Sequence, residues 1–215
     1  MKKILFIVGL MGLTLPSSFA QGTPWSVELQ GGWSLASLPT SVLGMRLEGE
    51  GPLHGLQGRL LLGLGLSEAF RVQFGMGYVP LGQSIKHLDH EDVLRVHSLE
   101  FPLLFQYSLR SSLGSLDLDA GPTGAFHLQA TAHNHENETE SEEDLPIGYE
   151  TTDYLKPFNL GLQAGLGLTH RSGWGLRLRY QAGLLELSNM EALEISSNYL
   201  ALSLAYRIPF PKVNP

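Results

Sequence analysis

The sequence predicts an all-β protein, an eight-stranded antiparallel up-and-down transmembrane β-barrel. Three observations predict it. Apolar and polar residues alternate with period two through eight segments, which is the pattern of β-strands. Most segments are close to the length, about 9–11 residues, that a tilted strand needs to cross the hydrocarbon of a bilayer. Long and short connections also alternate between the segments, as they do in outer-membrane barrels.

The first element is a targeting segment over residues 1–20. Two lysines precede an apolar run over residues 4–15 that is too short to span a bilayer. Residues 18–20, Ser-Phe-Ala, supply the small residues that signal peptidase requires. We therefore expect cleavage after Ala20, so that residues 21–215 form one outer-membrane β-barrel domain. A buried N-terminal helix is the alternative interpretation.

The eight alternating segments follow in order along the chain. They cover residues 25–35, 59–67, 70–78, 98–109, 116–128, 158–169, 174–184 and 200–210. One face of each segment is apolar, and the opposite face is small, polar or charged. A soluble barrel with an apolar interior would show the reverse arrangement, so we expect the apolar face to contact lipid. Aromatic residues near the segment ends are placed as interfacial girdles are: Trp25, Trp33, Tyr78, Tyr107, Trp174, Tyr206 and Phe210.

The connections between the segments predict how the barrel lies in the membrane. The long ones cover residues 37–54, 82–92, 131–154 and 186–197, and the short ones lie near residues 67–68, 110–114 and 171–173. Outer-membrane barrels have long extracellular loops and short periplasmic turns. The expected location is therefore the cell outer membrane, crossed many times, with both termini in the periplasm. Unpaired backbone groups are too costly in lipid, so the eight strands must close.

Composition excludes several classes of protein. The chain has no cysteine, which excludes a disulfide scaffold, a thiol-based zinc site and a catalytic cysteine. Its 14 basic and 21 acidic residues leave no basic excess, so nucleic acid is not an expected partner. The acidic residues concentrate in the long connections. Residues 131–154 contain eight acidic residues and no lysine or arginine, and such a run is normally solvated and mobile.

Several short motifs are shared with a known family. Residues 97–107, His-Ser-Leu-Glu-Phe-Pro-Leu-Leu-Phe-Gln-Tyr, contain an L-E-x-P-L-L strand, and Gly121-Pro122 lies in the next strand. The glycine-rich segment 161–167, residues 180–184 and the final strand beginning Asn198-Tyr-Leu also match. On these residues the chain resembles the PorT-like outer-membrane β-barrel domain family of Gram-negative bacteria. The resemblance implies an outer-membrane barrel whose relatives in some cases assist protein secretion, and it implies no catalytic residues.

Two prolines lie inside predicted strands, Pro102 and Pro122. Proline cannot donate to a β-ladder, so within sheets it is confined to edges and bulges. The preferred interpretation is a bulge that the two neighbouring strands share. The alternative is a lateral weak point in the barrel wall.

The alternation also predicts which charged residues face the lumen. They are Glu28, Glu100, Asp117 and Asp119 with Arg59, Arg71, Arg177, Arg179 and Arg207. An eight-stranded barrel is only wide enough for its own side chains, and buried charges require partners. We therefore expect a salt-bridge network that plugs the lumen. Arg207 and Glu28 lie near matching ends of the two strands that close the barrel, so they should be close. Acid–base catalysis by facing carboxylates would need a substrate-sized cleft.

Histidines are enriched in the long connections. His87, His90, His133 and His135 lie beside carboxylates, a combination that suits divalent metals. They are candidates for capture of a metal ion, or for bridging to lipopolysaccharide through calcium or magnesium. The simpler interpretation is a solvated loop, because clusters without supporting residues bind metals poorly.

These observations favour a non-enzymatic, monomeric barrel without a cofactor. We expect a role in envelope structure, or in interaction with a surface or secretion complex; the expected partners are outer-membrane lipid, lipopolysaccharide and an envelope or secretion protein. The sequence has no G-x-S-x-G, P-loop or H-E-x-x-H motif, and alternation places Ser98 and the adjacent His97 on opposite faces. The alternatives are a small pore, a lipid-modifying outer-membrane enzyme and a soluble lipocalin-like ligand carrier.

Overall fold

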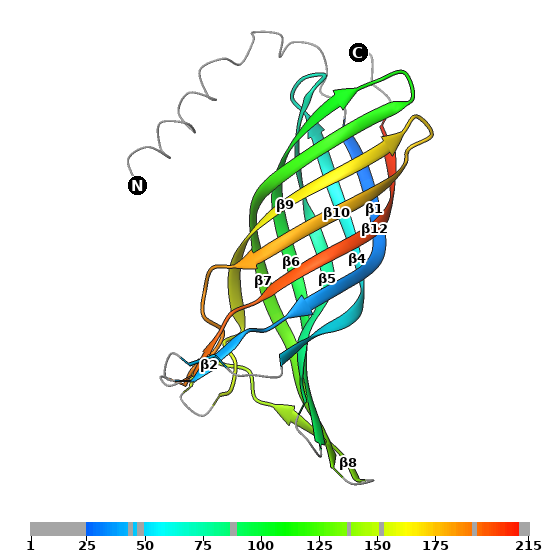
Figure 1. The fold of residues 1–215 in the computed structure, drawn as a ribbon. Coiled ribbons are helices and arrows are strands. Elements are labelled where there is room, and N and C mark those ends of the chain that lie inside the picture. Colours follow the sequence, from blue (N-terminus) through cyan, green and yellow to red (C-terminus); the bar gives the residue numbers. More distant parts are fainter. Residues whose placement is uncertain are drawn as a thin grey trace.

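Eight long strands form a closed antiparallel barrel in the computed structural model (Figure 1). The structure describes residues 25–42, 45–46, 50–86, 90–136, 139–150, 153–190 and 193–210. The barrel strands are β1 (Trp25–Ser37), β4 (Glu50–Gly65), β5 (Phe70–Lys86), β6 (His90–Arg110), β7 (Gly114–Glu136), β9 (Phe158–His170), β10 (Trp174–Gly183) and β12 (Asn198–Pro209). The predicted fold class is confirmed. The expected targeting segment lies outside the described residues, among which no helix is long and apolar enough to cross a membrane.

One row of paired residues shows how the barrel closes. Starting at Trp25, the pairing passes through every barrel strand in turn and returns to β1 at Leu35, ten residues further along. With a rise of about 3.3 Å per residue and a spacing of about 4.8 Å between strands, this stagger tilts the strands about 40° from the barrel axis. The lumen is therefore narrow, and side chains fill it.

Side-chain exposure follows the predicted alternation. In β12, Leu202 and Leu204 are more than half exposed, whereas Ala201, Ser203 and Ala205 between and beside them are buried. The other barrel strands show the same alternation across the membrane-crossing part of the wall. The apolar side chains therefore cover the outside of the barrel, and the small and polar side chains line its interior.

Aromatic pairs mark the end of the barrel that carries the short turns. Trp174 packs on Tyr206 with ring centroids 4.8 Å apart, and Phe70 packs on Tyr107 at 4.9 Å. The amide of Phe210 donates to the carbonyl of Trp25 at 2.8 Å, so both ends of the described chain lie here. This end has the aromatic collar that the sequence predicts.

The wall is much longer on one side of the barrel than on the other. β6 and β7 have 21 and 23 residues, whereas β10 has 10. The prediction that residues 82–92 and 131–154 are loops is therefore wrong for most of their length. β7 pairs with β6 on one edge and with β8 (Thr139–Leu145) on the other, beyond the barrel rim. The described residues 92–95 of β6 are all half-buried, so side-chain exposure in this extension does not alternate as it does in the rest of the wall.

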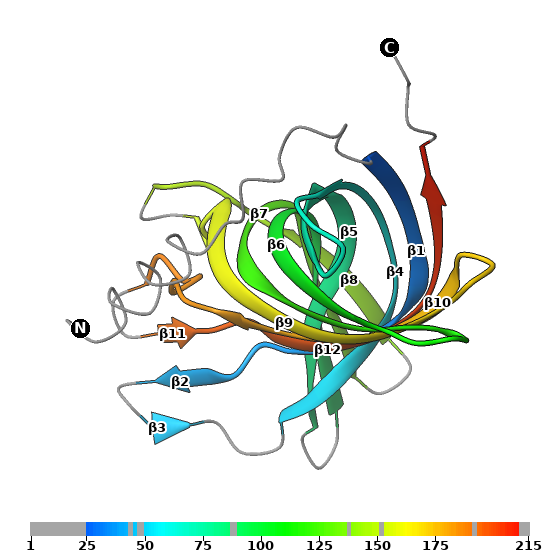
Figure 2. The same ribbon diagram turned by 90° about the horizontal axis from the view of Figure 1, so that it is seen from above.

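Three short strands form a second sheet beside the long-connection rim. They are β2 (Thr40–Val42), β3 (Met45–Arg46) and β11 (Leu193–Ile195), in the order β11-β2-β3. Figure 2 shows this sheet pointing outward, away from the barrel axis. It joins two of the long connections, 37–54 and 186–197, into one folded unit.

The two prolines do not create the predicted bulge. Pro102 pairs with Thr123 and Pro122 with Leu162, each without a change of register. The register shift between β6 and β7 lies instead at His97/Ser98. Near the prolines the pairing of β5 with β6, and of β6 with β7, is interrupted for two residues and then continues in the same register. A proline removes a donor without adding a residue, which explains a lapse without a shift.

Candidate functional site

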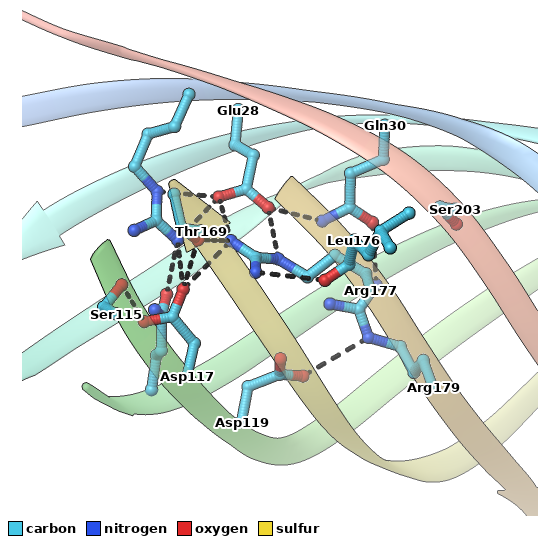
Figure 3. Close-up of polar contacts among 12 residues, drawn as sticks. Glu28, Gln30, Ser115, Asp117, Asp119, Thr169, Leu176, Arg177, Arg179 and Ser203 are labelled. Atoms are coloured by element: carbon cyan, nitrogen blue, oxygen red, sulfur yellow. Dashed lines mark hydrogen bonds and ion pairs between the residues drawn. The ribbon is translucent and has the colours of Figure 1, made fainter. Parts of the chain in front are cut away.

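Buried ion pairs fill the lumen near the short-turn end, and Glu28 is at their centre (Figure 3). Arg177 donates from Nε to Glu28 Oε1 at 2.9 Å and from Nη2 to Oε2 at 3.0 Å. Arg207 Nη2 lies 2.7 Å from Glu28 Oε2. The contact expected between Arg207 and Glu28 is therefore present. Glu28 is almost completely buried, so its charge depends on these two guanidinium groups.

Asp117 completes this first cluster. Its Oδ2 lies 3.1 Å from Arg177 Nη2 and 3.2 Å from Arg207 Nη2. Thr169 donates its hydroxyl to the same oxygen at 2.7 Å, and Ser115 donates to Oδ1 at 3.0 Å. Two carboxylates and two guanidinium groups thus form a neutral unit whose remaining lone pairs are bound by hydroxyls.

Gln30 connects this cluster to a second one that lies further from the short-turn end. Its amide nitrogen donates to Glu28 Oε1 at 2.8 Å, and its amide oxygen accepts from Arg179 Nη1 at 3.0 Å. Arg179 Nε also lies 3.3 Å from Asp119 Oδ1. The polar contacts therefore continue along the barrel axis from one layer to the next.

A third group lies around Glu100. Arg59 Nη2 is 2.8 Å from Glu100 Oε2, and the same oxygen accepts from Tyr199 Oη at 2.8 Å and from Gln163 Nε2 at 3.2 Å. Arg59 also donates to Tyr199 Oη and lies over its ring, 5.8 Å from the centroid. Tyr199 was not among the predicted lumen residues. Leu200 next to it faces outward, so the alternation of the strand places Tyr199 on the inward face.

Arg71 differs from the other predicted lumen residues. Among the described residues it makes no ion pair, and its Nε has no hydrogen-bond partner. It is only partly buried, close to the short-turn end. The nearby carboxylates, Glu28 and Asp117, are already bound by Arg177 and Arg207. The prediction that Arg71 joins the salt-bridge network is wrong in this respect.

Glycines on the inward face make room for the charged side chains. A Cβ at Gly167 would lie 2.0 Å from Arg177 Nη1, and one at Gly165 would lie 2.8 Å from Asp119 Oδ1. Any larger residue would displace these groups. The glycine-rich strand β9 is therefore the surface against which Arg177 and Asp119 pack.

An apolar core closes the lumen at the opposite end, and the sequence analysis did not predict it. Its buried residues are Ala36, Leu38, Val79, Leu81, Val96, Ala130, Leu155, Leu187, Ile195, Tyr199 and Ala201. The connections supply part of it: Lys156 donates its amide to the Leu187 carbonyl at 2.7 Å, and the Leu187 amide donates to the Ile195 carbonyl at 2.9 Å. We call this cluster the apolar cap. Burial raises the pKa of the Tyr154 phenol, which packs against it.

The structure pairs Ser98 with His127 rather than with the adjacent His97. Ser98 Oγ lies 2.8 Å from His127 Nδ1, and both side chains are buried in the lumen. A nucleophile of this type needs a third group that orients the histidine. His127 Nε2 has no hydrogen-bond partner among the described residues. His97 lies on the outside and stacks on Tyr78. The part of the chain that is described therefore holds no complete triad at Ser98.

The predicted metal-binding histidines lie on or beside the extended wall. His133 is opposite Glu142 and His135 opposite Glu140 in the β7–β8 register, while His90 begins β6 and His87 lies outside the described residues. The described side chains include no group of three or more metal-binding residues. Metal binding here stays a prediction.

Comparison with known proteins gives the following relatives. One family, described as the outer membrane protein beta-barrel domain, matches residues 19–189. No curated protein matches the chain. The fold is similar to that of Ail, the attachment invasion locus protein of Yersinia pestis, with 11% identity, a TM-score of 0.45, and coverage of 87% of this chain and 99% of that one.

Two further solved structures have the same kind of similarity. The outer membrane protein OprG from Pseudomonas aeruginosa has 11% identity and a TM-score of 0.48, with coverage of 87% of this chain and 98% of that one. The outer membrane protease OmpT from Escherichia coli has 9% identity and a TM-score of 0.46, with coverage of 90% and 100%.

Proposed function

The chain belongs to the outer membrane protein β-barrel domain family, and on that premise we propose that it is a non-enzymatic, non-conducting barrel of the bacterial outer membrane. Its role is structural support of the envelope and contact with a surface or secretion partner. The PorT-like resemblance supports the secretion side of this proposal. The partner binds the part of the wall that extends beyond the barrel.

The observation that carries the proposal is the double closure of the lumen. Ion pairs centred on Glu28 and Glu100 fill its membrane-crossing part, and the apolar cap covers its other end. An ion would have to displace paired charges at the first level and enter an apolar core at the second. Both steps are costly, which supports a barrel that conducts nothing.

The difference between the two ends supports the proposed orientation, with both termini in the periplasm. One end carries short turns, the aromatic collar and both ends of the described chain, and the other carries the long extension of β5 to β8. Outer-membrane barrels place short turns in the periplasm. The extension then points away from the cell, and its acidic sequence suits contact with a basic protein surface, or with lipopolysaccharide through divalent ions.

The non-enzymatic reading is supported by the Ser98–His127 pair. The pair lies inside the lumen, below the apolar cap, and not on the surface that faces lipid. A lipid-modifying enzyme needs its nucleophile where a lipid can reach it. Acyl transfer from a lipid to Ser98, or hydrolysis of a lipid there, would require the cap to open.

The proposal is tested in the outer membrane of intact cells. A peptide tag is placed in the connection between β7 and β8, and a photo-crosslinker replaces Asp144, an exposed residue of β8. We expect the tag to be labelled from outside and the crosslinker to capture lipopolysaccharide or an envelope protein. A crosslinker at Phe70, exposed in the aromatic collar of the short-turn end, is the control and should capture no lipopolysaccharide. Labelling only in lysed cells, or altered lipid A on overexpression, would contradict the proposal.

A further inference from the structure

A groove runs across the outer surface of the wall at the short-turn end. It has a volume of about 640 Å³ and lies between the β6–β7 turn and the β9–β10 turn, which are at the upper end of the barrel in Figure 1. The two turns are joined by a hydrogen bond from the Arg171 amide to the Leu113 carbonyl at 3.3 Å. A Cβ at Gly114 would lie 2.0 Å from the Thr169 carbonyl oxygen. No residue with a side chain fits there, so position 114 leaves the groove open.

The floor of the groove is a continuous row of leucines. Five consecutive strands each contribute one, and each is paired in register with the next: Leu109, Leu116, Leu168, Leu176 and Leu204. All five are more than a third exposed, and Trp174 lines the same groove. This row of leucines is an apolar surface on which a hydrocarbon chain can pack.

The rim of the groove is basic. Arg110 and His170 line it, and Arg171 follows in the β9–β10 turn. The nearest acid to Arg110 is Glu68 at 4.0 Å, and both side chains are so exposed that this pair contributes little. The Ser172 amide donates to His170 Nδ1, so the neutral ring carries its proton on Nε2 and can donate it outward. The rim thus offers two donors to an anion.

We propose that this groove binds one anionic phospholipid, with an acyl chain on the leucine row and the phosphate between Arg110 and His170. Arginine and phosphate form paired charge-assisted hydrogen bonds, and basic groups next to an apolar surface favour anionic headgroups. The two residues are on β6 and β9, separated by β7, so their backbones are about 10 Å apart. His170 shares the outward face of Leu168, whereas Arg110 lines the groove from the end of β6, where its strand stops.

The three tryptophans provide the test, because Trp174 lines the groove, whereas Trp33 pairs with Leu202 and lies outside the residues that line it. Residues 21–215 are reconstituted in nanodiscs as W25F/W33F, which retains only Trp174, and as W25F/W174F, which retains only Trp33. Quenching is measured with brominated phosphatidylglycerol and with brominated phosphatidylcholine. For Trp174 we expect half-maximal quenching at an about fivefold lower fraction of phosphatidylglycerol, and for Trp33 equal quenching by both lipids.

The headgroup site is tested with R110Q/H170Q in the Trp174 protein. The preference for phosphatidylglycerol should disappear, and R110K/H170K should retain it. Both residues are exposed and end their strands, and a heat-shift gel verifies folding of each variant. Equal quenching of Trp174 by the two lipids would overturn the proposal, because the wall would then contact bulk lipid only. A preference that survives in R110Q/H170Q, or that Trp33 shares, would overturn it as well.

Discussion

The two halves of the barrel interior differ in polarity. Within the membrane, the lumen holds Glu28, Glu100 and their arginine partners, and the outward face is leucine-rich. At the long-connection rim, the inside is the apolar cap, and the exposed residues are mixed: Asp144 and Glu186 are charged, whereas Met45 and Tyr149 are apolar or aromatic. The solvent outside the wall explains the difference. Lipid requires an apolar exterior, which leaves polar groups for the interior, whereas water allows the interior to be apolar as in a soluble protein.

The two halves of the barrel interior are also closed by different interactions. The polar half depends on pairing, because each buried charge is costly unless a partner binds it. The apolar half depends on packing, because its residues gain most when no space is left between them. Substitutions in the two halves should therefore destabilise the protein in different ways.

The largest effect is expected from Glu28→Ala. It leaves Arg177 and Arg207 close together without the carboxylate that both bind, and the expected loss is about 3–5 kcal/mol in the free energy of unfolding. Urea unfolding in detergent micelles, followed by tryptophan fluorescence, measures it. Glu68→Ala, in an exposed turn, is the control and should unfold as the parent does. Equal stability of the two variants would show that the polar half does not depend on pairing.

Leu155→Ala should have the next largest effect, and it should be local. Leu155 is fully buried in the apolar cap, and truncation of a buried leucine costs about 2–4 kcal/mol. The amides of Lys156 and Leu187 should exchange hydrogen faster, while those of the β1–β12 ladder keep their protection. Leu113→Ala, at an exposed position, should change neither. Faster exchange throughout the barrel would mean that the two halves are one cooperative unit.

Tyr199→Phe tests the boundary between the halves. The Tyr199 ring belongs to the apolar cap, while its hydroxyl binds Glu100 and Gln163. Loss of the hydroxyl should cost about 1–2 kcal/mol in unfolding free energy and leave the cap intact. Tyr180→Phe, at an exposed site on the wall, is the matched control. If Tyr199→Phe also accelerated exchange at Lys156, the hydroxyl would be holding the cap in place.

The smallest effect is expected from Arg71→Gln. Arg71 is half-buried and makes no ion pair with any described residue, so its replacement should change the unfolding free energy by less than about 0.5 kcal/mol. Arg59→Gln, which leaves Glu100 without its guanidinium partner, is the comparison. The two unfolding curves measured side by side should differ clearly. A large loss of unfolding free energy for Arg71→Gln would show that Arg71 contributes to the ion-pair network of the lumen.

Alternation predicted the polar half because lipid imposes a strict rule on every second residue. Leu202 and Ser203 had to point in opposite directions once the wall crossed a bilayer, so the face of each charged residue followed from its position in the strand. The contact between Arg207 and Glu28 followed from strand order. Which arginine binds which acid did not follow, because it depends on stagger and on glycines such as Gly167 that make room for a side chain.

The apolar half could not be predicted in the same way. Leu155, Leu187 and Ile195 come from connections without periodicity, and they meet only because the strands bring these connections together. The extension of β6 and β7 was missed for a related reason. The described residues 92–95 of β6 are all half-buried and do not alternate between exposed and buried, so a sequence rich in glutamate and histidine looked like a loop.

The central claim is that the lumen is closed at two levels, and single-channel recording in planar bilayers tests it most directly. Residues 21–215 are inserted, and insertion is verified by the heat-shifted band on a gel. We expect no stepwise current from this protein, while a general porin in the same bilayer conducts. Defined conductance steps from the unaltered chain would show that an ion path passes both the Glu28 cluster and the apolar cap, and the lumen would then not be closed.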